Sequence, residues 1–429
     1  MKTMIKSILV ALLTAEARVL LRRTKPAIIA VTGSVGKTGT KDAIYSVLKD
    51  TIHVRKSAKS YNSDVGVPLS VLGIENPGTN VFLWIRALAE GFLIMLAPRE
   101  YPDVLVLEVG VDHPGDMAKL TSWIRPDIVV LTRFPDVPVH VENFPTPEAV
   151  TEEKKQLLHA IKDDGVIVYN NDDEQIARAV AEMRQVSVGF SRYSRSAFVG
   201  ASETNVYEHG VPVGFEFVLN TQDTSHVVRV REVLGLGYVY VYTAAIAVAS
   251  LFEIPVDAAI ASLGKHVTAP GRMRILPGIK GTHIIDDTYN ASPVAMEEAL
   301  RTMRSVKNAK RRIAVLGDML ELGQYSIDEH RRIGGVAAES VDLLVTIGVR
   351  ARGIAEGALR AGFDEANITQ YDDALEAARE LERMLVEGDY VLIKGSQGMR
   401  MERVVEEIMA EPERAEELLV RQDAFWKTR

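Results

Sequence analysis

The chain has 429 residues and a net charge of −8, and 47% of its residues are hydrophobic and 25% charged. This composition is typical of a globular protein with two or three domains, and the acidic balance argues against nucleic acid as the main partner. Because the sequence contains no cysteine, disulfides, thiolate zinc sites and thiol nucleophiles are excluded.

The N-terminal stretch 4–21 is largely apolar and has basic residues at both ends. Glu16 and Arg18 interrupt it, and its longest uninterrupted apolar run, residues 8–13, is far too short to span a membrane. We predict an amphipathic helix that packs on the body of the protein. A helix that lies on a membrane surface is the alternative.

Residues 33–38 read GSVGKT and predict a phosphate-binding loop. An apolar run precedes them and apolar residues at helical spacing follow, so the context is strand, tight loop and helix. Inward-pointing backbone N–H groups and Lys37 would hold phosphates, and the Thr38 hydroxyl would hold Mg²⁺. A plain glycine-rich turn is the alternative, because Val31 stands where the general pattern has glycine. The predicted cofactor-binding residues of the loop are Gly33, Ser34, Val35, Gly36, Lys37 and Thr38.

Strand-like runs alternate with helical segments, as in a doubly wound α/β sheet. Ligands bind beyond the carboxyl ends of such strands, and Glu108 and His140 follow two of them. From about residue 186 to 234 the pattern alternates, which predicts antiparallel strands on one side of the sheet. Helices are predicted at 242–251 and 256–263. The first-half strand runs are 27–34, 103–110, 127–134 and 164–172.

Residues 268–278, TAPGRMRILPG, contain several glycine and proline breaks and are predicted to form a hinge. Further strand ends follow, separated by helical segments, so a second α/β domain is expected. These strand ends lie at 282–290, 311–319, 342–348 and 389–398.

Eight segments occur in order between residues 28 and 403: VTGSVGKTGTK, YNSDVGVPLSVL, LEVGVDHPGDM, the stretch 140–154, APGRM, DDTYNASPVAM, LGDMLELG and KGSQGMRME. Together they resemble the Mur ligases, the ATP-dependent amide-forming family of peptidoglycan precursor synthesis, and above all the members that add D-alanyl-D-alanine. The resemblance implies three parts. These are an N-terminal helix (1–25), a central ATP-binding phosphate-loop domain with a mostly parallel sheet and an antiparallel side (26–268), and a C-terminal Rossmann-like α/β domain (269–429).

The resemblance implies a cytoplasmic ligase that forms an acyl phosphate with ATP and joins it to D-alanyl-D-alanine or a similar amine. A carboxylate that approaches a polyanion needs cations more than it needs a general base. Lys37, Mg²⁺ on Thr38 and a second Mg²⁺ would supply them. Glu108 and His140 stand at positions for metal ligands, although imidazole is an unusual ligand for so hard a cation. A structural histidine is the alternative for His140.

The resemblance also assigns roles in the second domain. Asp287 would accept hydrogen bonds from the ATP ribose, Asn290 would lie near the adenine, and Arg272 would reach the phosphates from the hinge. An exposed hinge charge is the alternative for Arg272, and a purely turn-shaping role is the alternative for Ser396. The candidate substrate-binding residues are Asn62, Lys394, Ser396 and Arg400.

Lys154 falls in the middle of the apolar face of a helix predicted at 147–162, and Lys155 falls outside that face. A buried ammonium is costly, so the site must lower its pKa, pair it or modify it. Snorkelling to solvent, or pairing with an acid such as Glu108, is the alternative. The resemblance implies that CO₂ converts Lys154 into a carbamate that binds the second Mg²⁺.

Two features depart from the family pattern. Only 30 residues precede the segment VTGSVGKTGTK, so we expect the N-terminal domain that grips the uridine nucleotide to be absent. The acceptor is then a UDP-linked peptide bound in another way, or one without UDP. Residues 237–243 replace a His-Asn pair, which leaves the adenine contacts there open. The alternative functions are a phosphate-loop NTPase or phosphotransferase, and a non-catalytic nucleotide-binding partner of another ligase.

Overall fold

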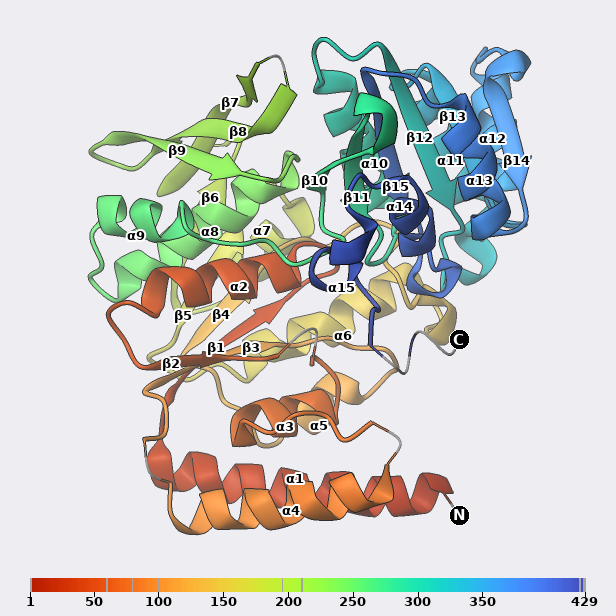
Figure 1. Cartoon of the computed structure of the whole chain (residues 1–429). Coiled ribbons are helices and arrows are strands. Elements are labelled where there is room, and N and C mark those ends of the chain that lie inside the picture. Colours follow the sequence, from red (N-terminus) through yellow and green to blue (C-terminus); the bar gives the residue numbers. More distant parts are fainter. Residues whose placement is uncertain are drawn as a thin grey trace.

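Two β-sheets organise the chain, and helices pack on both (Figure 1). The computed structural model describes residues 2–58, 61–78, 80–98, 100–194, 196–209, 211–423 and 426. The first sheet has nine strands and the second has six. The predicted α/β fold, with a mostly parallel sheet, an antiparallel side and a second α/β unit, is confirmed.

The nine-stranded sheet is parallel over most of its width. Its strands are β1 (Ala27–Thr32), β2 (Val54–Lys56), β3 (Val104–Glu108), β4 (Ile128–Leu131), β5 (Val166–Asn170), β6 (Val186–Ser191), β7 (Phe198–Glu208), β8 (Val211–Asn220) and β9 (Ser225–Arg231). They are ordered β2-β3-β1-β4-β5-β6-β7-β8-β9. Only the pairs β7–β8 and β8–β9 are antiparallel. The prediction of antiparallel strands from residue 186 was therefore wrong for β6, which is parallel to both of its neighbours.

Helices cover both faces of this sheet, and β1 is apolar along nearly its whole length for that reason. Ile29 and Val31 point into one core, and Ile28 and Ala30 point into the other. The first core is closed by α2 (Lys37–Leu48), α8 (Gly237–Leu251) and α9 (Val256–Leu263). The second is closed by α1 (Lys2–Thr24), α3 (Gly66–Leu72), α4 (Val81–Leu96), α5 (Asp116–Thr121), α6 (Pro147–His159) and α7 (Glu174–Ala181).

The six-stranded sheet forms the second unit, at the upper right of Figure 1. Its strands are β10 (Arg274–Pro277), β11 (His283–Asp287), β12 (Arg311–Gly317), β13 (Leu343–Ile347), β14 (Ile368–Tyr371) and β15 (Asp389–Lys394). Their order is β10-β11-β15-β12-β13-β14, and only β10 is antiparallel to its neighbour. The helices of this unit are α10 (Pro293–Ser305), α11 (Ser326–Ala338), α12 (Arg352–Arg360), α13 (Ala374–Met384), α14 (Glu402–Ile408) and α15 (Ala415–Leu418).

Two predicted boundaries need correction. The hinge predicted at 268–278 is only partly irregular, because residues 274–277 pair with β11 as an edge strand. Helix α8 begins at Gly237, five residues before the predicted start at Tyr242.

The N-terminal helix packs on the body of the protein, as predicted, through Leu13, Ala17 and Leu20, which are buried. It is not amphipathic in the usual sense, because its outer side is also apolar, with Leu12 and Val19 exposed. In the described part of the chain, no helix combines the length and apolarity that crossing a membrane requires.

Helix α4 lies beside α1 and runs in the same direction, and the sequence analysis did not identify it (Figure 1). A Cβ at Gly91 would lie 2.3 Å from Glu16 Oε2, so glycine permits the close approach of the two helices. At their carboxyl ends, Arg23 donates to the carbonyl oxygens of Met95 and Leu96. Burial at this contact raises the pKa of Glu16 to about 7.

The packing of α1 can be tested by cutting back one buried side chain. Leu20→Ala should lower the free energy of unfolding by about 3 kcal/mol, because it leaves a cavity between α1 and its neighbours. Leu12→Ala changes a side chain on the exposed side of α1. It should lower the free energy of unfolding by less than about 1 kcal/mol. Urea unfolding of the two variants measures both values, and equal losses would contradict the orientation of α1.

Candidate functional site

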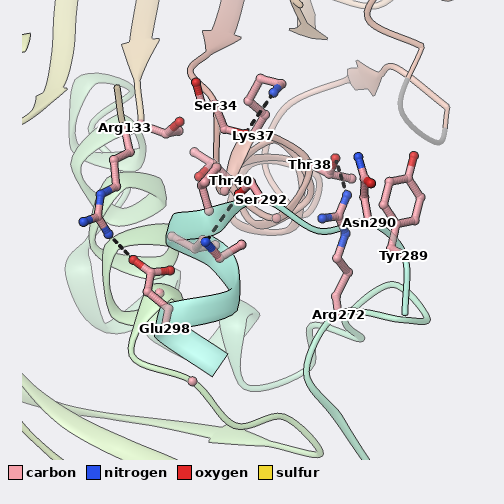
Figure 2. Close-up of a pocket in the computed structure, with 18 of the residues that line it drawn as sticks. Ser34, Lys37, Thr38, Thr40, Arg133, Arg272, Tyr289, Asn290, Ser292 and Glu298 are labelled. Atoms are coloured by element: carbon pink, nitrogen blue, oxygen red, sulfur yellow. Dashed lines mark hydrogen bonds and ion pairs between the residues drawn. The ribbon is translucent and has the colours of Figure 1, made fainter. Parts of the chain in front are cut away.

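A cavity of about 360 Å³ opens at the carboxyl ends of β1, β3, β4 and β5, between the two sheets (Figure 2). Its wall includes residues 34–40 and Glu108 from the first unit, and Asp287, Asn290 and Lys394 from the second. A volume of this order is typical of a small-molecule site. The two halves of the chain thus contribute to one site.

The GSVGKT segment forms a tight loop between β1 and α2, as predicted. Gly33 has φ 143°, and a Cβ there would lie 2.0 Å from Thr132 Oγ1 on the neighbouring strand end. Gly36 has φ 84° and caps α2 in the left-handed conformation. Both positions therefore require glycine, and the loop places the N-terminus of α2 at the cavity.

The Lys37 ammonium folds back over the loop and donates to the carbonyl oxygen of Gly33 at 2.8 Å. Burial lowers its pKa, and the charge of Glu108 opposes that effect. Arg272, which precedes β10, comes within 3.4 Å of Thr38 Oγ1 through Nη2 and stacks on the Tyr289 ring (Figure 2). Arg272 is thus directed at the phosphate loop and not at solvent.

Lys154 is buried in the wall behind the loop, on the inner face of α6, whereas Lys155 pairs with Glu152 near the surface. The Lys154 Nζ donates to Ser34 Oγ at 2.6 Å. Burial, and then the neighbouring Lys37, hold the pKa of the Lys154 ammonium well below its usual range. The snorkelling alternative was therefore wrong, and no ion pair between Lys154 and Glu108 is present in the described residues.

Glu108 is almost completely buried at the end of β3. Asn62 Nδ2 donates to its Oε1 at 3.1 Å, and its backbone N–H donates to Ser57 Oγ. Its Oε2 has no hydrogen-bond partner among the described residues. The nearest cation to that oxygen is Lys41, whose Nζ lies 3.8 Å away.

His140 adopts a left-handed conformation with φ 67° at the cavity wall. Its Nδ1 lies 2.8 Å from Glu321 of the second unit, and its Nε2 lies 3.3 Å from Asp112. Among the described residues, no group of three or more histidine and acidic side chains could hold a metal ion. The metal-binding roles of Glu108 and His140 stay predictions.

Asp287 and Lys394 pair with each other at 2.6 Å on the second unit's side of the cavity. Lys394 also donates to the carbonyl oxygen of Asn290, and the Asn290 side chain accepts from the backbone nitrogen of Gln397. These three residues are therefore connected, and they line the cavity opposite the phosphate loop.

Two of the four candidate substrate residues do not line the cavity. Ser396 accepts a hydrogen bond from the backbone nitrogen of Leu320, which fits its turn-shaping alternative. Arg400 is engaged by Glu402 and by the carbonyl oxygen of Trp426. Asn62 and Lys394 do line the cavity.

Comparison with known proteins agrees with this two-part site. The Mur ligase middle domain matches residues 31–84 and 91–249, and the Mur ligase glutamate ligase domain matches residues 271–397. The UDP-N-acetylmuramoyl-tripeptide–D-alanyl-D-alanine ligase of Mycobacterium leprae (strain TN) is 30% identical over 395 residues, which cover 86% of this chain and 71% of that protein. The chain belongs to the Mur ligase family.

Two further similarities place this Mur ligase more closely. The UDP-N-acetylmuramoyl-tripeptide–D-alanyl-D-alanine ligase of Bacillus subtilis (strain 168) is 29% identical over 399 residues, covering 92% of this chain and 79% of that protein. The crystal structure of MurF ligase from Thermotoga maritima in complex with ADP has a TM-score of 0.76 and 26% identity, covering 94% of this chain and 84% of that one. The family resemblance that the sequence motifs indicated is confirmed.

An ion pair without any signal in the sequence joins the two units of this Mur ligase. Arg133, just after β4, pairs with Glu298 of α10 across the cavity (Figure 2). Burial raises the pKa of Glu298, and the Arg133 guanidinium opposes that rise. No local pattern could have shown this pair, because its members are 165 residues apart.

Lys41, on α2, is a further residue that the sequence patterns did not single out. It is 1% exposed, and its Nζ donates to the carbonyl oxygen of Ser57 and lies 3.4 Å from Asp42 and 3.8 Å from Glu108. Burial lowers its pKa. The signal in the sequence was a lysine four residues after Lys37, on a helix that must pack closely on the sheet.

Lys41→Met should lower the free energy of unfolding by about 3 kcal/mol, because two carboxylates then lose a buried counter-charge. Lys56→Met is the matched control. Lys56 contacts the same Asp42 at 2.7 Å, but its side chain is 35% exposed, so its loss should cost less than about 1 kcal/mol. Urea unfolding compares the two variants, and the opposite ranking would contradict a structural role for Lys41.

Proposed function

We propose that this Mur ligase is an ATP-dependent amide ligase that forms an acyl phosphate on a peptide precursor and transfers the acyl group to D-alanyl-D-alanine or a similar amine. The observation that supports it most is the meeting of the phosphate loop with Arg272 and Asp287 in one cavity. Relatives over nearly the whole chain are named as ligases of this kind. We propose a cytoplasmic location and the domain division 1–25, 26–268 and 269–429 on the same grounds.

Each half of the cavity has its own role in holding ATP. Backbone N–H groups of residues 33–38 and the Lys37 ammonium face the phosphates, and Arg272 adds a second cation from the other side. Lys37 exchanges its bond to the Gly33 carbonyl for one to phosphate oxygen. We assign Asp287 to the ribose and Asn290 to the adenine, and the ion pair with Lys394 supports the position of Asp287.

The side chains around Glu108 fit a magnesium ion. Its Oε2 is a buried carboxylate oxygen without a hydrogen-bond partner among the described residues, and such oxygens are the ligands that Mg²⁺ prefers. Thr38 and Glu108 are the residues we assign to two Mg²⁺ ions, with His140 after release from Asp112 and Glu321. The bound ions would neutralise charge that develops on the transferring phosphoryl group.

We also assign residues to the acceptor carboxylate and the amine. Asn62 and Lys394 are the substrate contacts we propose, since both line the cavity. Ser396 and Arg400 act indirectly, by shaping the turn that carries Lys394. The acceptor is a UDP-linked peptide or one without UDP, and the amine and acceptor are small molecules.

The reaction can be tested by following ADP release with UDP-linked tripeptide, D-alanyl-D-alanine and matched analogues of each. ADP release should require both the acceptor and the amine. Lys37→Ala should reduce the rate at least about a thousandfold, because the transferring phosphoryl group loses a preorganised charge. Lys49→Ala, exposed beyond the other end of α2, is the matched control and should change little.

Two results would contradict the proposal. ADP release that needs no amine would indicate an NTPase or phosphotransferase. Nucleotide binding without turnover in the presence of every acceptor and amine pair would indicate a non-catalytic partner. Normal turnover of Lys37→Ala would mean that the loop assignment is wrong.

We further propose that Lys154 is carbamylated. The lowered pKa makes the neutral amine available, and Ser34 Oγ orients the Lys154 nitrogen by accepting a hydrogen bond from its Nζ at 2.6 Å. The amine nitrogen attacks the carbon of CO₂, one C=O electron pair moves to oxygen, and a proton leaves the nitrogen for solvent. The product is an anion that would hold the second Mg²⁺.

Lys154→Ala should lose most of the ligase activity and regain part of it when a small carboxylate is added. Lys155→Ala, one position along α6 but outside the buried face, should be nearly silent. An independent readout is a ¹³C NMR carbamate signal after incubation with labelled bicarbonate, present in wild type and in Lys155→Ala and absent in Lys154→Ala. Full activity of Lys154→Ala, or no carbamate signal in wild type, would contradict the proposal.

A further inference from the structure

Helices α1 and α4 form an exposed apolar face that is separate from the cavity. Of the nineteen large apolar side chains that are exposed in the described part of the chain, ten belong to these two helices of 23 and 16 residues. They are Ile8, Leu12, Val19, Val81, Phe82, Leu83, Ile85, Phe92, Leu93 and Leu96. Exposed clusters of this kind mark an interaction surface.

The exposed side chains form continuous stripes at helical spacing. On α4, Phe82, Ile85, Phe92 and Leu93 face outward, and Phe82 is 82% exposed. The inner sides of the same helices are already satisfied by the core, through residues such as Leu13 and Trp84. The outer stripes are therefore not needed for folding of the chain.

Only part of this two-helix face lies outside the family match. Helix α1 ends before residue 31, where the family match begins, and residues 85–90 in the middle of α4 fall between the two matched stretches. Figure 1 shows both helices at the edge of the molecule farthest from the six-stranded sheet. Their outer face is thus remote from the second unit and from its side of the cavity.

The charge on α1 indicates which kind of partner binds the exposed apolar face. This helix contains five basic residues and one acid, Glu16, whereas the whole chain has a net charge of −8. Arg22 follows the apolar stripe of α1, and Arg86 lies on the exposed side of α4 together with one acid, Glu90. A second copy of the chain would bring two cationic helices together, which is unfavourable, whereas an anionic surface would attract them.

We propose that α1 and α4 together dock this ligase in the plane of an anionic lipid bilayer. Apolar side chains of the two outer stripes enter the headgroup boundary, and the basic residues contact lipid phosphates. No described helix could cross the bilayer, so the contact is at the surface. A membrane-surface helix was the alternative for residues 4–21, and the proposed contact adds α4 to that helix. The proposed contact does not depend on the ligase reaction.

The test is co-sedimentation of the full chain with vesicles. Wild type should bind vesicles of equal parts phosphatidylcholine and phosphatidylglycerol, and should bind phosphatidylcholine alone weakly. The triple variant F82S/F92S/L93S should bind about a hundredfold less, because it loses three apolar side chains that would enter the headgroup boundary of the bilayer. The matched control, V186S/I327S/V349S, changes three equally exposed apolar positions elsewhere and should bind like wild type.

Charge is tested separately with R22Q/R86Q, which should weaken binding to the mixed vesicles by roughly tenfold or more. R178Q/R360Q, at exposed positions on α7 and α12, is the control and should have no effect. Arg23 is left intact because it joins α1 to α4.

Three results would overturn the proposal: equal binding to neutral and anionic vesicles, unchanged binding of the triple variant, or a wild-type dimer in sedimentation velocity that dissociates in the triple variant and does not bind vesicles. ADP release by the triple variant, measured with soluble substrates, should equal that of wild type. Loss of lipid binding and failure of the ligase reaction are thereby separated.

Discussion

The convergence of three basic side chains on the phosphate loop is the constraint on which the site depends. Lys37, Lys154 and Arg272 meet there, and burial lowers the pKa of both lysines. Lys37 is held by a carbonyl oxygen, and Arg272 is held by a hydroxyl and an aromatic ring, all of which are weak neutral partners. Such partners are readily exchanged for phosphate oxygens, which bind cations more strongly. The cavity is therefore electrostatically prepared for a polyanion, although the chain as a whole is acidic.

The same charge distribution explains why the site needs both halves of the chain. The phosphate loop supplies cations and helix-terminal N–H groups, but few acidic residues of the first unit lie near it. One of these, Glu108, also lies close to the Lys41 ammonium. The second unit contributes Asp287, Glu298 and Glu321, which pair with Lys394, Arg133 and His140. Two of these pairs, Arg133–Glu298 and His140–Glu321, join the units directly. A nucleotide that displaces them would change how the units are held together.

Sequence patterns predicted those parts of the structure that depend on neighbours along the chain. The phosphate loop followed from glycine spacing between a strand and a helix, and the burial of Lys154 followed from its position on one face of α6. The patterns could not predict Arg133–Glu298, because such a pair depends on how two sheets are placed. They also missed α4, whose exposed side is apolar except for Arg86 and Glu90 and so differs little in polarity from its buried side. The direction of β6 was wrong because alternation reports one exposed face of a strand, and not whether its partner is parallel.

The outer helices and the cavity are far apart, yet one short segment touches both. Helix α3 packs between α1 and β3, and Gly66 at its start lies so close to Tyr61 that a Cβ there would be 2.7 Å from the Tyr61 backbone. The neighbouring residue Asn62 donates to Glu108 at 3.1 Å. Helix α3 therefore connects α1 with the segment that positions the Glu108 carboxylate. Because protein interiors are close-packed, α3 cannot shift far without disturbing that segment. The packing of α1 is thus one of the contacts that hold the proposed metal ligand in place, although α1 does not reach the cavity.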